Sequence, residues 1–324
     1  MTNDPFVSYA QNGEDVVLWR ALHSVTPGRY VEVGANDPKT HSISRAFYDR
    51  GWSGIEIEPV PAFAQRFREA RPRDVVVEAA ITSEDVETVT LHVIPESGLS
   101  TLRDDVGAEH ARSGWPVEEV SVPARRLDDV LAEHVPAGED VHFLVIDTEG
   151  AERQVLESID LATWRPWVLV IEATAPMSDV RTHEAWEPLV LEGGYQFCLF
   201  DGLSRWYVAD ERAAELLPSL DHPACALDPW VSRSTFEAEQ RVEDLTAENA
   251  ELLEQLIKWR GQVLARWAEA ASAAVHTPGA GGVSLHESAR LRAELDAMQQ
   301  TLSWRVTAPL RDVRTAQLRR SRRA

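Results

Sequence analysis

The sequence predicts an α/β fold, in which a Rossmann-like, mostly parallel sheet with an antiparallel hairpin at its end precedes an α-helical coiled-coil tail. Up to about Pro229, short apolar runs alternate with helix-like stretches, as in a sheet covered by helices on both faces. The last two strand candidates are joined only by Asp201-Gly202, which indicates a hairpin and therefore one antiparallel strand. From about Ser234 onward, the chain reads as helix with a seven-residue repeat.

The first part of the chain contains alternating strand and helix candidates. The expected strands are Tyr30–Gly34, Ser53–Glu58, Asp74–Ala80, Val141–Asp147, Trp167–Glu172, Tyr195–Phe200 and Arg205–Val208. The expected helices are Glu14–Ser24, Ser42–Arg50, Pro61–Ala70, Ala151–Ile159 and His183–Glu192. An inserted strand pair is expected from Glu87–Pro95 and Val120–Leu127, with a mobile loop or short helix over Arg103–Pro116.

The C-terminal part contains an apolar seam. Its two seven-residue series are Val242, Asn249, Leu256 and Val263, and Leu245, Leu252 and Trp259. Such a seam predicts a coiled coil, and an asparagine within it favours a parallel dimer. A helix folded back on the first domain is the alternative. The expected divisions are an α/β domain at 1–232, a coiled-coil helix at 233–276, a Gly/Pro linker at 277–283 and a helix with a basic tail at 284–324.

The net charge of the chain and the basic segment at its C-terminal end indicate which kinds of partner it can bind. The formal net charge is −21, which disfavours nucleic acid as a ligand. Residues 305–324 nevertheless contain seven arginines and one acid. With Trp304 and Leu310, this tail is suited to peripheral contact with an anionic membrane face or to an acidic partner, and a solvated, disordered tail is the alternative. The sequence shows no membrane-spanning run and no signal peptide, so a cytoplasmic protein is expected, with peripheral attachment to the inner membrane face through this tail.

The segment Glu32–Asp37 is the first candidate for ligand binding. It follows an expected strand, and Gly34 permits close approach of a ligand to the backbone. The glycine fingerprint of dinucleotide-binding domains is absent, which argues against NAD. Asn36 and Asp37 suit an uncharged nucleoside with a zwitterionic amino-acid tail. The predicted cofactor is therefore S-adenosyl-L-methionine.

Two later strands extend this cofactor site. Glu58 follows the second strand, and a carboxylate there can accept hydrogen bonds from both ribose hydroxyls. We prefer Glu58 to Glu56 because ligands bind at the carboxyl ends of the strands. The alternative is a residue that caps the helix near Pro61. The third strand ends with Ala80 and Ile81, and small residues at this strand end would leave space for a flat adenine.

Acidic residues also gather where the fourth and fifth strands end. Asp147 and Glu149 are expected to lie close together, and crowded carboxylates serve as general bases or metal ligands. Glu149 could instead stabilise the N-terminus of the next helix, and Glu172 is a further candidate at the same edge. His41 is a third candidate base, with a structural histidine as its alternative. A divalent metal could activate the acceptor instead, but no cluster in the sequence indicates one.

Taken together, these motifs resemble the FkbM family of methyltransferases. The matching segments are Ser8–Asp15, Val31–Asp37, His41-Ser42, Gly51–Ile55, Ile57–Pro59, Leu99–Leu102, Ile146–Gly150 and Val170–Glu172. The resemblance implies methyl transfer from S-adenosylmethionine to a hydroxyl oxygen, often on a sugar or polyketide. It also implies that Gln11, Glu14 and Asp15 line the amino-acid end of the cofactor, although they could equally cap the first helix. Pro38 departs from the family, which commonly has glycine there.

The expected cofactor contacts combine the motifs with the resemblance. They are Gln11, Glu14, Glu32, Gly34, Ala35, Asn36, Asp37, Glu58, Ala80, Ile81 and Asp147. The acceptor is expected to be a hydroxyl of a sugar, glycan or glycolipid intermediate, bound by the loops at 97–120 and 174–186. Residues 303–311 resemble tails of bacterial glycan-assembly proteins. The partners expected for the tail are a second copy of the chain or such proteins, and the alternative function is an inactive scaffold that recruits them.

Overall fold

The computed structural model describes residues 5–95, 97–275, 285–301 and 304. The chain divides into two compact units, Met1–Arg241 and Val242–Ala324. The first unit holds every strand among the described residues, and the second is almost entirely helical where it is described. Among these residues, none of the helices combines the length and the apolar character that a membrane crossing requires.

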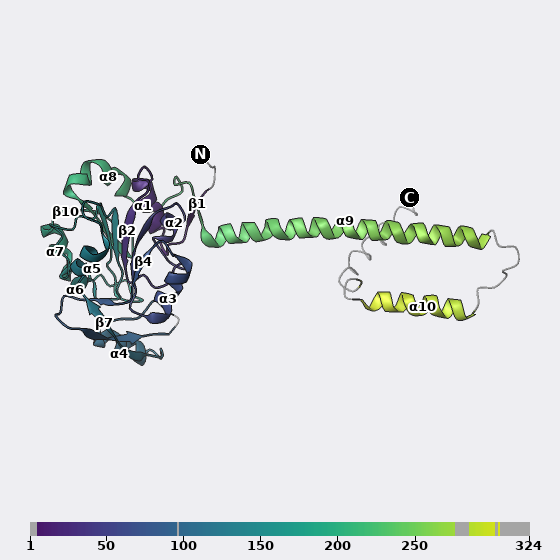
Figure 1. The fold of residues 1–324 in the computed structure, drawn as a ribbon, viewed down its shortest axis with the longest axis horizontal. Helices are drawn as coiled ribbons and strands as arrows, with labels where there is room; N and C mark the ends of the chain where they lie inside the picture. The colour runs from purple at the N-terminus through teal and green to yellow at the C-terminus, as the bar shows by residue number, and fades with distance from the viewer. Residues whose placement is uncertain (1–4, 96, 276–284, 302–303, 305–324) are drawn as a thin grey trace. The chain divides into compact units, whose positions relative to one another are not determined.

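Strands form the centre of the first unit, with helices around them (Figure 1). They make a seven-stranded sheet in the order β10-β11-β9-β8-β2-β3-β4. These strands are β2 (Arg29–Val33), β3 (Ser53–Ile57), β4 (Val75–Val77), β8 (Phe143–Ile146), β9 (Val168–Glu172), β10 (Tyr195–Phe200) and β11 (Ser204–Ala209). All neighbours are parallel except β11, which runs antiparallel to both β9 and β10. The predicted hairpin is confirmed, and the sheet has the order and directions of the methyltransferase variant of the Rossmann fold.

Helices cover both faces of this sheet. They are α1 (Glu14–Leu22), α2 (Arg45–Tyr48), α3 (Pro61–Ala70), α5 (Leu127–His134), α6 (Glu152–Leu156), α7 (Glu187–Glu192) and α8 (Ala213–Leu220), with the 3-10 helices η1 (His183–Ala185) and η2 (Asp210–Arg212). Alternate strand residues point to opposite faces. Val31 therefore packs in one core with residues of α5, α6 and α7, whereas Tyr30 packs in a second core with residues of α1, α2 and α8. Burial on both faces explains the nearly continuous apolar strands.

The predicted insertion forms a second, three-stranded sheet. Its strands are β5 (Ala80–Ile81), β6 (Thr88–Val93) and β7 (Glu118–Arg125), and α4 (Asp104–Arg112) connects β6 to β7. The expected antiparallel pair and the short helix between its strands are confirmed. The expected strand Asp74–Ala80 is wrong in its extent. The sheet strand ends at Val77, and the chain then leaves the large sheet to pair Ala80 with Ala124 of β7.

One pairing in the first unit was not expected. The short strand β1 (Phe6–Ser8) runs parallel to β12 (Trp230–Ser232), although more than 200 residues separate them in the sequence. Asp15 fixes this segment, since its carboxylate accepts hydrogen bonds from the Ser8 hydroxyl and from the backbone N–H groups of Tyr9 and Ala10. The first and last strands of the α/β domain are therefore hydrogen-bonded to each other.

The C-terminal part consists of α9 (Arg233–Val275) and α10 (Leu285–Gln300). The predicted long helix is confirmed, and all the apolar residues of its heptad seam are exposed. Leu252 and Leu256, for example, retain 53% and 57% of their accessible surface. All of the predicted linker and nearly all of the basic tail lie outside the described residues, since residues 276–284, 302–303 and 305–324 are not described.

Candidate active site

The loop after β2 passes unusually close to the end of β8. Gly34 has φ +83°, and a Cβ atom on it would lie 1.7 Å from the carbonyl oxygen of Asp147. Only glycine therefore fits at this position, for both conformational and steric reasons. The backbone N–H groups of Gly34 and Ala35 donate to the carbonyl of Ile57. These contacts bring the ends of three adjacent strands together, as the motif at Glu32–Asp37 predicts.

Glu58 lies beside this loop at the end of β3. Its carboxylate accepts hydrogen bonds from the backbone N–H of Asn36 (2.8 Å) and of Val60 (2.7 Å). The side chain is only 4% exposed, and burial raises its pKa to about 7. Glu56, by contrast, is fully buried in an ion pair with Arg71 at 2.6 Å. The arrangement leaves Glu58 as the β3 carboxylate that faces a cavity.

Two adjoining cavities occupy this edge of the sheet. The smaller one, about 60 Å³, is walled mainly by apolar side chains, and Glu58 lies in its lining with Ala80 and Ile81. The larger one, about 400 Å³, contains the predicted residues Gln11, Glu14, Glu32, Ala35 and His41. Gly34, Asn36, Gly98, Asp147 and Glu149 line both. The predicted site residues therefore gather around two connected spaces.

Asp37 is the exception among the predicted contacts. It lines neither cavity, because its carboxylate closes the turn by accepting hydrogen bonds from the backbone N–H of Lys39 and of Thr40. Next to it, the carbonyl of Pro38 accepts two hydrogen bonds from the buried Arg71 guanidinium. Asp37 and Pro38 thus shape the loop without facing either space. Asp15, already engaged by the N-terminal segment, also lies outside both cavity linings.

The loop at residues 97–102, which is part of the segment 97–120 that the sequence analysis expects to bind the acceptor, contributes to the lining of both cavities. Gly98 approaches Asn36 so closely that a Cβ atom would lie 2.9 Å from the Asn36 amide nitrogen. Thr101 forms a backbone bridge with His92 and donates its hydroxyl to the carbonyl of Glu149. The loop joins the small sheet to the end of β8. The sequence signals for this loop were the family resemblance at Leu99–Leu102 and the expected acceptor loop at 97–120.

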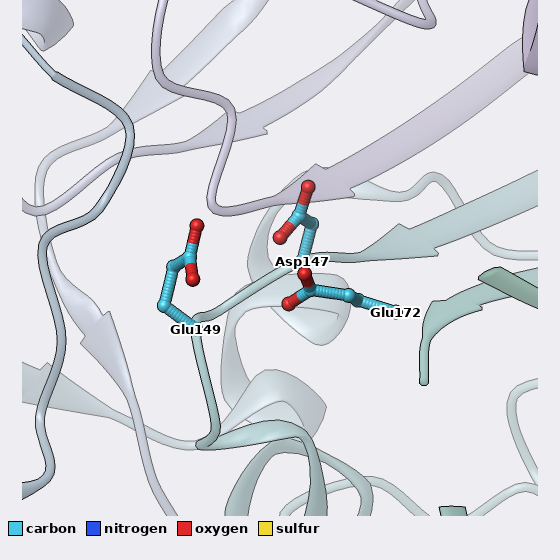
Figure 2. A group of neighbouring side chains, drawn as sticks. All are labelled: Asp147, Glu149 and Glu172. Carbon is cyan, nitrogen blue, oxygen red and sulfur yellow. The ribbon is translucent and has the colours of Figure 1, made fainter. Parts of the chain in front are cut away.

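Three carboxylates that line the larger cavity lie close together (Figure 2). Asp147 follows β8, Glu149 lies two residues later at φ +52°, and Glu172 ends β9. One oxygen from each lies within 4.8 Å of one oxygen of the other two. Burial raises the pKa of Asp147 to about 6, although a hydrogen bond with the Glu172 side chain lowers it. Burial and the charge of Asp147 raise the pKa of Glu149 to about 9. Burial likewise raises the pKa of Glu172.

Three further ionisable residues, Glu14, Glu32 and His41, also line the larger cavity. Glu14, which begins α1, accepts a hydrogen bond from the backbone N–H of Asn12, and burial raises its pKa to about 8. Glu32 accepts hydrogen bonds from the Ser44 hydroxyl and the Ile43 N–H. His41 is exposed and adopts φ +57°. Of the described residues that line this cavity, His41 is the only one with a basic side chain.

Comparison with solved structures gives distant similarities. A TehB-like S-adenosylmethionine-dependent methyltransferase from Corynebacterium glutamicum is 9% identical, with 61% of this chain and 88% of that chain covered and a TM-score of 0.34. Magnesium protoporphyrin IX methyltransferase from Synechocystis is 9% identical, with coverages of 60% and 77% and a TM-score of 0.34. A methyltransferase of calicheamicin biosynthesis is 14% identical, with coverages of 61% and 53% and a TM-score of 0.31.

Comparison with curated proteins gave no match. The profile of a protein family, described as the methyltransferase FkbM domain, matches residues 32–197. The matched segment begins in β2 with Glu32 and ends in β10, so it contains the cofactor loop, Glu58 and the three carboxylates. It covers more than half of the 324 residues. The chain therefore belongs to the FkbM methyltransferase family.

Proposed function

We propose that this protein transfers a methyl group from S-adenosylmethionine to a hydroxyl oxygen of a sugar, glycan or glycolipid intermediate. The observation that carries the proposal is the pair of adjoining cavities. One is mainly apolar with the Glu58 carboxylate in its lining, and the other is acidic. This division matches a ligand with a nucleoside at one end and a positively charged group at the other. The FkbM resemblance supports oxygen as the atom that accepts the methyl group.

The residues present fit S-adenosylmethionine. The Gly34 turn leaves no space for a side chain because the Asp147 carbonyl lies against it, and this packing holds the loop at the edge of both cavities. We assign Glu58 to the ribose hydroxyls, which can both donate to one carboxylate, and Ala80 and Ile81 to the adenine. Glu14 and Gln11 line the acidic cavity, where a carboxylate would attract the cofactor's ammonium group.

Bound S-adenosylmethionine would supply a methyl group on a positively charged sulfur, so the acceptor oxygen gains the methyl group, the sulfur becomes a neutral thioether and the hydroxyl proton passes to a base. Asp147, Glu149 and His41 border the larger cavity and are the candidate proton acceptors. A positioned base contributes about 10²- to 10⁴-fold in rate. Because the walls of this cavity come from several strand ends, they would also align the two reacting groups.

The first experiment measures binding of S-adenosylmethionine to the full chain by isothermal titration calorimetry. We expect binding of one molecule per chain, weakened at least tenfold in Glu58→Gln and unchanged in Glu84→Gln, a matched substitution of an exposed glutamate. Absence of any heat of binding would contradict the proposal and favour the alternative of an inactive scaffold.

The second experiment identifies the acceptor chemistry. The protein is incubated with methyl-labelled S-adenosylmethionine and a bacterial glycolipid fraction, and the labelled product is treated with mild alkali. A methyl ether keeps its label, whereas a methyl ester loses it. Retained label in the sugar portion supports the proposal. Label that is released by alkali, or that resides on nitrogen, would contradict transfer to a hydroxyl oxygen.

We also propose that α9 pairs with α9 of a second copy of the chain. Its seam residues follow the heptad spacing and are exposed, and Asn249 lies within the seam. Sedimentation equilibrium should give a dimer for the wild type and for Ala247→Glu, which lies outside the seam. Leu252→Glu, within the seam, should give a monomer. A monomeric wild-type protein would contradict the pairing.

A further inference from the structure

The larger cavity has more carboxyl groups in its lining than the proposed cofactor can pair with. Its lining includes the carboxylates of Glu14, Glu32, Asp147, Glu149 and Glu172. S-adenosylmethionine has two positive groups and one carboxylate, so its net charge is about +1 at neutral pH, given an α-carboxyl pKa near 3.5. Buried carboxylates are costly unless they are paired or coordinate a metal. The cavity is therefore suited to an additional cation.

The geometry of Asp147, Glu149 and Glu172 is suited to one ion rather than several. One oxygen from each lies within 4.8 Å of the other two. Oxygen ligands lie about 2.1 Å from Mg²⁺ and about 2.3–2.6 Å from Ca²⁺, so two ligands on opposite sides are about 4 to 5 Å apart. The observed spacing is within that range. Two of the residues sit at the ends of neighbouring parallel strands, β8 and β9, which fixes their backbones.

Glu172 supplies independent support. Its side chain is 6% exposed, and its Oε2 atom is buried without a hydrogen-bond partner. The carboxyl group points toward those of Asp147 and Glu149 (Figure 2). A buried polar atom without a partner requires an explanation, and an unplaced ion is one.

Among the described residues, the three carboxylates are not paired with a cationic side chain. In the part of the chain that the structure describes, no arginine or lysine forms an ion pair with Asp147, Glu149 or Glu172. Glu56, which is equally buried, has Arg71 at 2.6 Å. The chain thus places a guanidinium beside a buried glutamate elsewhere in the same sheet. At Asp147, Glu149 and Glu172, which line the larger cavity, the described residues provide no such guanidinium.

We infer that Asp147, Glu149 and Glu172 bind one divalent cation of the Mg²⁺ or Mn²⁺ class. Hard cations of this kind prefer carboxylate oxygens and keep several waters, and the open side of the cavity can accommodate these. The role of the ion rests on the proposed function: beside the acceptor it would lower the pKa of the hydroxyl that receives the methyl group. Asp147 and Glu149 would then act as ligands, leaving His41 or solvent to take the proton.

The test uses the full chain after treatment with EDTA and dialysis. Mn²⁺ is titrated, and the free ion is followed by electron paramagnetic resonance. We expect one bound Mn²⁺ per chain, displaced by Mg²⁺. Glu172→Gln should weaken binding by about tenfold or more, since affinity follows the number of charged ligands. Asp179→Asn, an exposed acid on the loop that borders the cavity, should bind as the wild type does.

Two results would overturn the inference: no saturable Mn²⁺ binding by the wild type, or binding that both Glu172→Gln and Glu149→Gln leave unchanged. Circular dichroism and S-adenosylmethionine affinity establish that each variant is folded, and Glu149→Gln replaces Glu172→Gln if that variant does not fold. S-adenosylmethionine binding is measured separately in EDTA. Cofactor binding without Mn²⁺ binding overturns only the cation site, whereas Mn²⁺ binding without cofactor binding overturns only the proposed function.

Discussion

Two clusters of buried charge occupy the same sheet, and they differ in one respect. Around Arg71, at the end of α3, Glu56 and Asp74 are buried with a guanidinium between them, and Ser42 and Ser44 complete its hydrogen bonds. At the ends of β8 and β9, Asp147, Glu149 and Glu172 lie close together, and among the described residues no arginine or lysine forms an ion pair with them. In the first cluster the protein supplies its own cation. In the second, on the further inference, a ligand from outside supplies it, as is common at functional sites.

The largest expected effect is on turnover, and it tests the second cluster. Asp147→Ala removes a candidate proton acceptor and, on the further inference, a cation ligand. Methyl transfer should fall by about 10² to 10⁴, while affinity for S-adenosylmethionine should change by only a few fold. Single-turnover rates and calorimetry measure the two quantities. Unchanged turnover would remove Asp147 from the mechanism.

A comparable effect on stability tests the first cluster. Arg71→Met leaves the Glu56 carboxylate buried without its partner, and breaking a buried ion pair in this way costs about 3–5 kcal/mol. Urea denaturation should show that loss. The double variant Arg71→Met with Glu56→Gln should recover more than half of it, since no charge then remains unpaired. Equal loss in both variants would mean that the ion pair is not the origin of the stability.

Glu58 should show opposite effects on stability and binding. Burial raises its pKa from 4.5 to about 7, so its contribution to stability is fully present below about pH 4.5 and is lost as the pH rises through about 7. Glu58→Gln cannot ionise and should therefore be more stable than the wild type at pH 8, by about 1–3 kcal/mol. Thermal and urea unfolding at pH 8 and pH 4.5 check this, and a less stable variant at pH 8 would contradict it.

The smallest effect concerns the pH dependence of cofactor affinity. Only the ionised Glu58 carboxylate can accept from both ribose hydroxyls, and with a pKa of about 7 roughly a tenth of the free protein is ionised at pH 6. Affinity for S-adenosylmethionine should fall about tenfold between pH 8 and pH 6. Calorimetry of Glu58→Gln should show a weaker fall. The same slope in both proteins would assign the titration to another group, such as Glu14.

The sequence predicted most strands of the large sheet because their apolar runs are local signals. It also predicted the glycine turn after β2 and the proximity of Asp147 and Glu149, since the ends of parallel strands meet at one edge. It did not predict the pairing of β1 with β12, the cluster around Arg71 or the contact between Gly98 and Asn36. Each of these depends on residues far apart in the chain, which no local pattern encodes.

Glu172 illustrates the limit most clearly. Its position at the end of a strand made it a candidate, but only the structure shows that its carboxylate joins those of Asp147 and Glu149 within 4.8 Å. The same holds for Asp37, where the sequence suggested a cofactor contact and the structure shows a carboxylate that closes the turn. Both residues are acids that follow or end a strand, so their residue type does not distinguish them. Only the distances between atoms show that Glu172 joins the carboxylate cluster and that Asp37 does not.

The most direct test of the central claim is a crystal structure of the full chain with S-adenosylhomocysteine. The claim is that the acidic edge of the sheet, unlike the cluster around Arg71, is built for a ligand. The predicted result places the ribose hydroxyls within hydrogen-bond distance of Glu58, the adenine against Ala80 and Ile81, and the amino-acid end in the cavity lined by Glu14. A ligand found outside both cavities, or cavities that stay empty at saturating concentration, would contradict it.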